Sequence, residues 1–149
     1  MYKHILLPTD GSPLSLKAAK DAAELAKSMK AKITALYVVP PFYPPYMGDG
    51  IAFSASDYSP DIHEARHDRF ADEAFAKVEA TAARAKVPVK RLKVNGDAPW
   101  RSIIDSARAK RCDVIVMASH GRGGVGTLVL GSETNKVLAH SKTPVLVCR

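Results

Sequence analysis

The chain has 149 residues, of which 46% are hydrophobic and 25% are charged, which is typical of one soluble globular domain with a substantial core. No apolar run approaches the roughly 20 residues of a membrane-spanning helix, and the N-terminus lacks the apolar core of a signal peptide, so we expect a cytoplasmic protein with no membrane partner. The net charge of +7 is spread along the chain and interrupted by acids, which disfavours nucleic-acid binding.

The first elements follow one another closely. His4–Pro8 is a continuous apolar run typical of a buried strand. Ser12 and Pro13 then form a helix start, because a serine oxygen caps free N–H groups and proline needs no N–H at that position. Lys32–Val39 is predicted to be a second strand. Pro40–Pro60 has no clear periodicity, and loops of this length tend to be functional.

Strand and helix patterns continue to alternate in the second half of the chain. The further predicted elements are a helix over Asp61–Ala85, a strand over Val89–Val94, a helix from Pro99, a strand over Asp113–Met117, a helix over Ser132–His140 and a strand over Pro144–Cys148. This alternation predicts an α/β fold, an open parallel five-stranded sheet with helices on both faces, in one domain spanning residues 1–149. In such sheets ligands bind beyond the carboxyl ends of the strands, which points to the loops after Leu7, Val39 and Met117.

Two cysteines, Cys112 and Cys148, lie in or beside apolar segments and match no paired ligand or redox spacing. We interpret both as small core residues in a reducing compartment.

A glycine-containing loop follows the strand that ends at Met117. Gly121 and Gly131 allow close approach of the backbone to a ligand. The helix that begins after Gly131 offers free N–H groups and a positive dipole end, a combination that favours an anion such as phosphate. The N–H groups in question belong to Ser132, Glu133 and Thr134. Arg122 adds a cation suited to phosphate.

The loop has a specific spacing. Gly121 is followed by nine residues and then by Gly131–Ser132, which resembles the nucleotide motif of the universal stress proteins. Pro8–Ser12 resembles that family's first loop, and Pro144–Cys148 its closing strand. The first glycine of the motif is replaced by Ala118 in this chain. The resemblance covers essentially the whole chain and implies a Rossmann-like fold of the adenine nucleotide alpha-hydrolase type.

The resemblance also implies roles for individual residues. Asp10 would hold the ribose hydroxyls, although aspartate before glycine also commonly bonds its own backbone in a turn. Val38 would contact adenine through its backbone, and Met117 would line the base pocket. The nucleotide-binding residues that the resemblance implies are Pro8, Thr9, Asp10, Val38, Met117, Ala118, His120, Gly121, Arg122, Gly131, Ser132, Glu133 and Thr134.

The implied function is that of an ATP-binding universal stress protein, a stress-responsive regulatory module that holds ATP, ADP or AMP. We expect at most slow ATP hydrolysis, because His120 is the one general base near the predicted phosphate position, and we assign no catalytic residue. Mg²⁺ would be held by phosphate oxygens and water, with no metal ligand from the protein. The family resemblance further implies a homodimer through Val145–Cys148, an apolar strand that we expect at a sheet edge. The alternatives are a nucleotide-free interaction protein of the same fold and, less favoured, a nucleotide alpha-hydrolase.

Three other motifs are weaker. Gly121–Gly126 fits the dinucleotide fingerprint, but it follows a late strand and lacks the acidic partner on a second strand. A P-loop is excluded because neither Gly-Lys-Ser nor Gly-Lys-Thr occurs. His63 and His67 fit the zinc-protease pattern His-Glu-x-x-His, but Phe70 and Glu73 break one of its continuations, so we interpret both as surface histidines.

Overall fold

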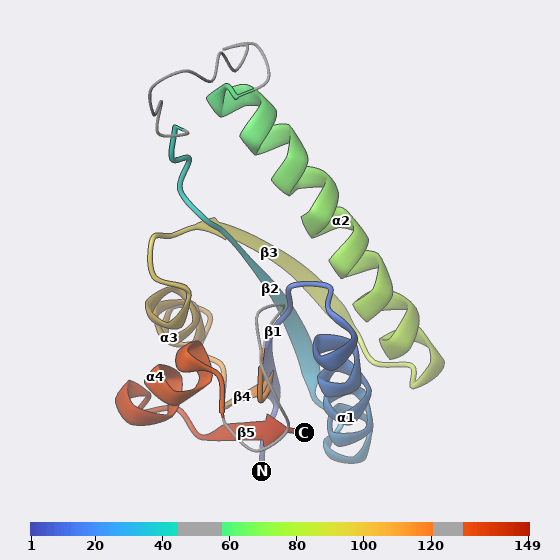
Figure 1. The fold of residues 1–149 in the computed structure, drawn as a ribbon. Helices are drawn as coiled ribbons and strands as arrows, with labels where there is room; N and C mark the ends of the chain where they lie inside the picture. Colours follow the sequence, from blue (N-terminus) through green and yellow to red (C-terminus); the bar gives the residue numbers. More distant parts are fainter. Residues whose placement is uncertain (45–57, 121–129) are drawn as a thin grey trace.

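A computed structural model of the chain describes residues 1–44, 58–120 and 130–149 (Figure 1). Strands and helices alternate in the order β1 (His4–Pro8), α1 (Pro13–Met29), β2 (Lys32–Val39), α2 (Pro60–Arg84), β3 (Val89–Asn95), α3 (Pro99–Ala109), β4 (Val114–Ala118), α4 (Ser132–His140) and β5 (Val145–Cys148). Each predicted element is present, with its ends shifted by at most one residue. Within the described ranges, no helix combines the length and apolar character needed to cross a bilayer.

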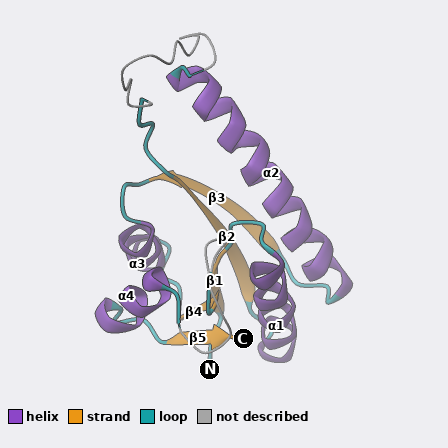
Figure 2. Cartoon of the chain, viewed as in Figure 1, coloured by secondary structure: helices purple, strands orange, loops and turns teal. Residues whose placement is uncertain are grey.

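The strands form a single parallel sheet of five, in the order β3-β2-β1-β4-β5 (Figure 2). From β1 the chain moves outward to β2 and β3, then crosses to the other side of β1 to form β4 and β5. The strand order therefore reverses between β1 and β4, which is where open α/β sheets bind ligands. The predicted open parallel sheet is confirmed, and β5 lies at an edge as expected.

The central strands are buried because both faces of the sheet are covered. Ile5, Leu6 and Leu7 of β1 are completely buried. Alternate side chains of a strand point to opposite faces, and accordingly Ile5 and Leu7 belong to one hydrophobic cluster while Leu6 belongs to another. A continuous apolar run in the sequence is therefore the signature of this position in the sheet.

Two helices pack on each face of the sheet (Figure 2). On one face, α1 and α2 present small and aromatic side chains such as Ala22, Phe75 and Val78 to the sheet. On the other face, Ile103 of α3 and Val137 of α4 pack on the strands. This arrangement leaves the loops at the carboxyl ends of β1 and β4 between the two helical layers.

Helix starts agree with their capping chemistry. The Oγ of Ser12 accepts a hydrogen bond from the N–H of Ser15 at 3.2 Å, and Pro13 is the first residue of α1. The Oγ of Ser59 accepts similarly from Ile62 at the start of α2. Serine followed by proline thus begins both long helices.

Candidate functional site

The loop after β1 is held by hydrogen bonds within itself and to β2. The Thr9 side chain is buried, and its Oγ1 donates to the Oγ of Ser15 at 3.2 Å and accepts from the N–H of Gly11 at 3.3 Å. Gly11 has a φ of 76°, a left-handed conformation that favours glycine. These contacts fix the direction in which the chain leaves β1.

Asp10 is half-buried in this loop. Its Oδ1 accepts a hydrogen bond from the N–H of Ser12 at 2.9 Å, so the turn described for aspartate before glycine is formed. A carboxylate offers about four lone-pair positions. The bond to Ser12 therefore orients Asp10 at the end of β1 and is compatible with a second role toward a ligand.

The end of β4 is connected to the start of α4 by two hydrogen bonds. The N–H of Gly131 donates to the carbonyl oxygen of Ser119 at 2.8 Å, and the Oγ1 of Thr134 donates to the carbonyl oxygen of Ala118 at 3.1 Å. A Cβ on Gly131 would lie 3.2 Å from the Ser119 oxygen and 3.4 Å from the Cα of His120. Glycine at this position thus permits a close approach that any side chain would crowd.

This approach places the N-terminus of α4 beside the point where the strand order reverses. The N-cap is Gly131, which has no side chain that could accept from the N–H groups of the first turn. The first hydrogen bond of the helix runs from the N–H of Asn135 to the Gly131 carbonyl. The Ser132 side chain is exposed, and that of Thr134 is buried. The first turn of α4 consequently offers N–H groups and a positive dipole end for an anion.

The Glu133 carboxylate has a structural partner that sequence reasoning missed. Its Oε2 accepts from the backbone N–H of Trp100 at 2.8 Å, and its Oε1 pairs with Lys136 at 3.1 Å. Ala98, the N-cap of α3, makes no side-chain cap bond, so Glu133 caps α3 from another helix. Among the predicted phosphate contacts, Glu133 is thus placed to use its backbone N–H rather than its side chain.

His120 follows β4 directly. Its Nδ1 shares a hydrogen bond of 2.9 Å with the Oγ of Ser119, a buried residue that the sequence reasoning did not assign to the site. Its Nε2 is buried and has no hydrogen-bond partner within the described part of the chain. A buried ring nitrogen without a partner is costly, and a ligand oxygen would satisfy it.

The backbone of Val38 faces the end of β1. The N–H of Thr9 donates to the Leu36 carbonyl at 2.9 Å on the β1 side of β2, whereas the N–H of Gly96 donates to the Val39 carbonyl at 3.0 Å on the β3 side. Peptide groups alternate between the two sides of a strand. The N–H and carbonyl groups of Val38 therefore point to the β1 side, beyond the last pair of the β1 and β2 ladder.

The other predicted residues divide into three groups. Pro8 is half-buried at the end of β1. Met117 is only 6% exposed and belongs to the cluster under α3 and α4, so its side chain is mainly a core residue. Gly121 and Arg122, together with the glycines between 123 and 126, lie outside the described residues. The structure thus brings Thr9, Asp10, Ala118, His120, Gly131 and Thr134 to the carboxyl ends of β1 and β4.

The histidine pair of α2 is placed elsewhere, beside the end of β2. The Nε2 of His63 is bonded to the Pro40 carbonyl at 2.8 Å, and the Nδ1 of His67 to the hydroxyl of Tyr37 at 3.2 Å. The two imidazole rings lie 4.5 Å apart between centroids. Over the described residues, no group of three or more His, Cys, Asp or Glu side chains is arranged to hold a metal ion.

The chain matches known proteins along its full length. The model of the universal stress protein family matches residues 1–149. A universal stress protein of Methanocaldococcus jannaschii is 34% identical over 149 residues, which cover 100% of this chain and 83% of the relative.

Solved structures show the same fold. A universal stress protein from Lactobacillus plantarum superimposes with a TM-score of 0.77 at 26% identity, covering 99% of this chain and 98% of the other. A universal stress protein in complex with cAMP has a TM-score of 0.66 at 24% identity, with 99% and 97% covered. One from Archaeoglobus fulgidus in complex with dAMP has a TM-score of 0.72 at 16% identity, with 99% and 98% covered. The protein therefore belongs to the universal stress protein family.

Proposed function

We propose that this universal stress protein binds ATP and acts as a stress-responsive regulatory module with at most slow ATP hydrolysis. The observation that carries the proposal is the position of Gly131, which brings the N-terminus of α4 against the end of β4, beside the strand-order reversal. The oxygens of a phosphate chain there would accept hydrogen bonds from the N–H groups of Ser132 and Glu133. The positive end of the helix dipole would stabilise their negative charge.

The other parts of an adenine nucleotide have matching groups nearby. The Asp10 carboxylate at the end of β1 suits two ribose hydroxyls, and the backbone of Val38 offers a donor and an acceptor on the same side of β2. The buried Nε2 of His120 lacks a partner within the described residues, and a phosphate oxygen would supply one. Two family members are described in complex with cAMP and with dAMP, ligands that share the adenine nucleotide.

Ala118 is the one departure from the glycine motif, and its position is compatible with binding. The side chain is only 8% exposed and belongs to the hydrophobic cluster under α1 and α2. Its methyl group thus fills the core, while its carbonyl accepts from Thr134. We infer that replacing glycine by alanine here leaves the approach to the first turn of α4 open.

The proposal assigns no catalytic residue and no metal ligand. ADP and AMP would occupy the same groups as ATP with fewer phosphate contacts. The Mg²⁺ that accompanies ATP would be held by phosphate oxygens and water, which agrees with its reluctance to lose its water shell. Turnover at about one per second or faster in pure protein would place the chain among ordinary enzymes and contradict a regulatory role.

We further propose a cytoplasmic single-domain protein that forms a homodimer through β5, Val145–Cys148. Two buried, unpaired cysteines suit a reducing compartment. β5 lies at the sheet edge and exposes Leu146, and exposed apolar edges need cover. No nucleic acid or membrane partner is part of this proposal.

Thermal unfolding with ATP, ADP, AMP and adenosine tests the nucleotide site. A ligand present at about 100 times its dissociation constant should add about 2.7 kcal/mol to the free energy of unfolding. Asp10→Asn should weaken all four ligands, because all carry the ribose, while Asp97→Asn, on an exposed loop after β3, should not. The absence of stabilisation by any of the four would instead support the alternative, a nucleotide-free interaction protein of this fold.

A further inference from the structure

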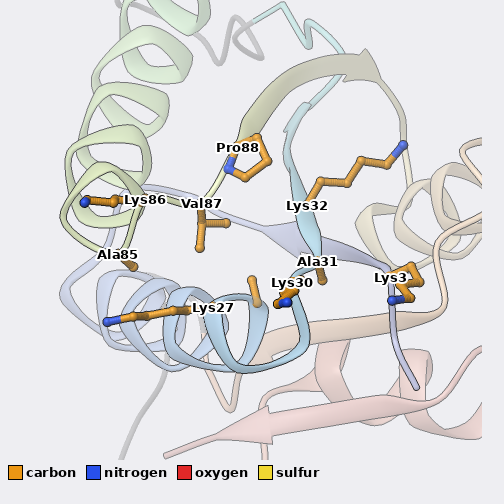
Figure 3. A pocket seen from close by; sticks show the side chains of 10 residues that line it. Lys3, Lys27, Lys30, Ala31, Lys32, Ala85, Lys86, Val87 and Pro88 are labelled. Carbon is orange, nitrogen blue, oxygen red and sulfur yellow. The ribbon is translucent and has the colours of Figure 1, made fainter.

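A cavity of about 400 Å³ lies at the opposite end of the sheet from the candidate nucleotide site. It is formed by the C-terminal ends of α1 and α2 and by the segments that lead into β1, β2 and β3 (Figure 3). Its charged lining residues are all lysines, namely Lys3, Lys27, Lys30, Lys32 and Lys86. The other lining residues are Ala26, Ala31, Ala85, Val87 and Pro88, so the described lining contains no acid.

The lysines come from separate segments and lie along the edge of the cavity. Figure 3 shows Lys27 and Lys86 on one side, Lys3 and Lys32 on the other, and Lys30 between them. The two helix ends face the cavity with residues in left-handed conformations, since φ is 54° at Lys30 and 57° at Lys86. The fold thus gathers at one end of the sheet charges that are far apart in the sequence.

None of these lysines forms an ion pair within the described ranges. The ion pairs found there involve Arg91, Lys93, Arg108 and Lys136 instead. The Asp113 carboxylate accepts from the backbone N–H groups of Lys3 and His4. All five lysines are exposed, and Figure 3 shows the ammonium nitrogens of Lys27 and Lys86 turned away from that of Lys32. An anion in the cavity would therefore be reached by rotation of the flexible lysine side chains.

The ordinary explanation for lysines at helix ends is that they compensate the helix dipole. Here the terminal carbonyls are already satisfied by the backbone: Ala31 donates to the Ala26 carbonyl at 2.8 Å, and Val87 donates to the Ala82 carbonyl at 3.0 Å. Lys3 and Lys32, moreover, belong to strand starts rather than helix ends. Dipole compensation therefore explains at most part of the cluster.

We propose that this cavity binds a compact polyphosphate group, either free inorganic polyphosphate or the phosphate tail of a nucleotide. Its volume of about 400 Å³ lies within the range of about 300–1,000 Å³ that is usual for small-molecule pockets. Several lysines around a small volume match an anion that carries several charges on adjacent groups, and each ammonium offers three donors. The alanine, valine and proline walls contribute no charge that would oppose it.

The test is calorimetric titration of the full chain with sodium tripolyphosphate at fixed ionic strength. The variant Lys30→Asn/Lys86→Asn removes two of the lysines, and asparagine tolerates the left-handed backbone at both positions. The matched control Lys20→Gln/Lys77→Gln removes the same charge from exposed positions on α1 and α2 outside the cavity lining. Unfolding midpoints of both variants establish that they are folded.

Saturable binding of tripolyphosphate that falls about tenfold or more in the cavity variant, and less than about twofold in the control, is the expected result. Equal losses in both variants, or the absence of lysine-dependent saturable binding of both tripolyphosphate and ATP, would overturn the proposal. Lysine-dependent binding of ATP without tripolyphosphate binding would identify a nucleotide tail as the occupant. If a single-stranded oligonucleotide alone bound in a lysine-dependent way, the ligand of the cavity would be nucleic acid, and the proposal of a small polyphosphate ligand would be overturned.

Adenosine titration separates this site from the proposed nucleotide site. Adenosine carries no phosphate, so its binding should be unchanged in Lys30→Asn/Lys86→Asn and weakened in Asp10→Asn. The two proposals can therefore fail independently.

Discussion

The backbone N–H of Gly131 donates to the carbonyl oxygen of Ser119 at 2.8 Å, which ties the start of α4 to the end of β4. The two residues lie at the strand-order reversal, where the loop after β1 is also found. The proposed nucleotide site depends on this contact, because it determines where the free N–H groups of α4 lie.

Substituting Gly131 should disrupt that contact by steric crowding, not by strain in the backbone. Its φ of −59° is accessible to any residue, but a Cβ would lie 3.2 Å from the Ser119 oxygen. We expect Gly131→Val to cost about 1–3 kcal/mol of stability by overpacking and to lower ATP affinity about tenfold or more. Gly131→Ala should show smaller effects in the same direction. Calorimetric titration with ATP checks the series, and a folded Gly131→Val protein with wild-type affinity would refute the assigned role.

Thr134 supports the same junction from inside the protein. Its buried Oγ1 donates to the Ala118 carbonyl at 3.1 Å, and Thr134→Val would remove that donor with little change of shape. We expect a loss of about 1–3 kcal/mol in urea unfolding, the usual cost of an unsatisfied buried acceptor. Thr134→Ser keeps the hydroxyl and is the matched control. Equal stability of the valine and serine variants would show that the hydrogen bond does not hold the junction.

The two cysteines should be unreactive in the native protein. Burial raises the pKa of Cys112 to about 11 and that of Cys148 to about 12. At about pH 8 both thiols are therefore protonated, and the thiolate is the reactive form. A thiol reagent should modify neither cysteine in native buffer and both in denaturant. Rapid labelling of the native chain would contradict the buried placement.

The same raised pKa values determine the sign of a pH effect on stability. The native state holds the thiol protons more tightly than the unfolded state, so this contribution is fully present below the ordinary thiol range near 8.5. It is lost as the pH rises through that range toward about 11 for Cys112. Cys112→Ala and Cys148→Ala should therefore flatten the decline of stability between about pH 8.5 and 11 in denaturant unfolding. A decline as steep as in the wild type would assign it to other groups.

Leu146 is the residue through which to test the proposed dimer. It is 44% exposed on the edge strand β5, whereas Val145 and Val147 are half-buried and Val145 packs against the core. Leu146→Lys should give a monomer on size-exclusion chromatography with light scattering. Ile62→Lys, at a 37% exposed position on α2, is the control and should leave the wild-type mass unchanged. An unchanged mass for both variants would exclude β5 as the interface.

The elements were predictable from local patterns, because each pattern has a local cause. The apolar run His4–Pro8 marks a strand buried on both faces, and Ser12 with Pro13 marks a helix start. The glycine spacing predicted that Gly131 and Ser132 would open the last helix, and α4 does begin at Ser132 with Gly131 as its N-cap.

Contacts between distant segments were not predictable in this way. The bond from Trp100 to Glu133 joins residues 33 positions apart and depends on how α3 and α4 pack together. The direction of the Val38 backbone depends on the strand register, and the lysine cavity depends on the approach of two helix ends. The predicted phosphate contact of Glu133 stays a prediction for its backbone N–H, and the capping of α3 by its carboxylate is a further role that the sequence did not indicate.

Amide chemical-shift mapping of ¹⁵N-labelled protein during titration with Mg²⁺-ATP is the decisive test of ATP binding at this site. We expect saturable shifts that include Asp10, Val38, His120, Ser132 and Glu133, at the carboxyl ends of β1, β2 and β4 and at the first turn of α4. AMP should shift Asp10 and Val38 while leaving smaller changes in α4. Saturation without shifts in these residues, or shifts confined to the lysine cavity, would contradict ATP binding at this site.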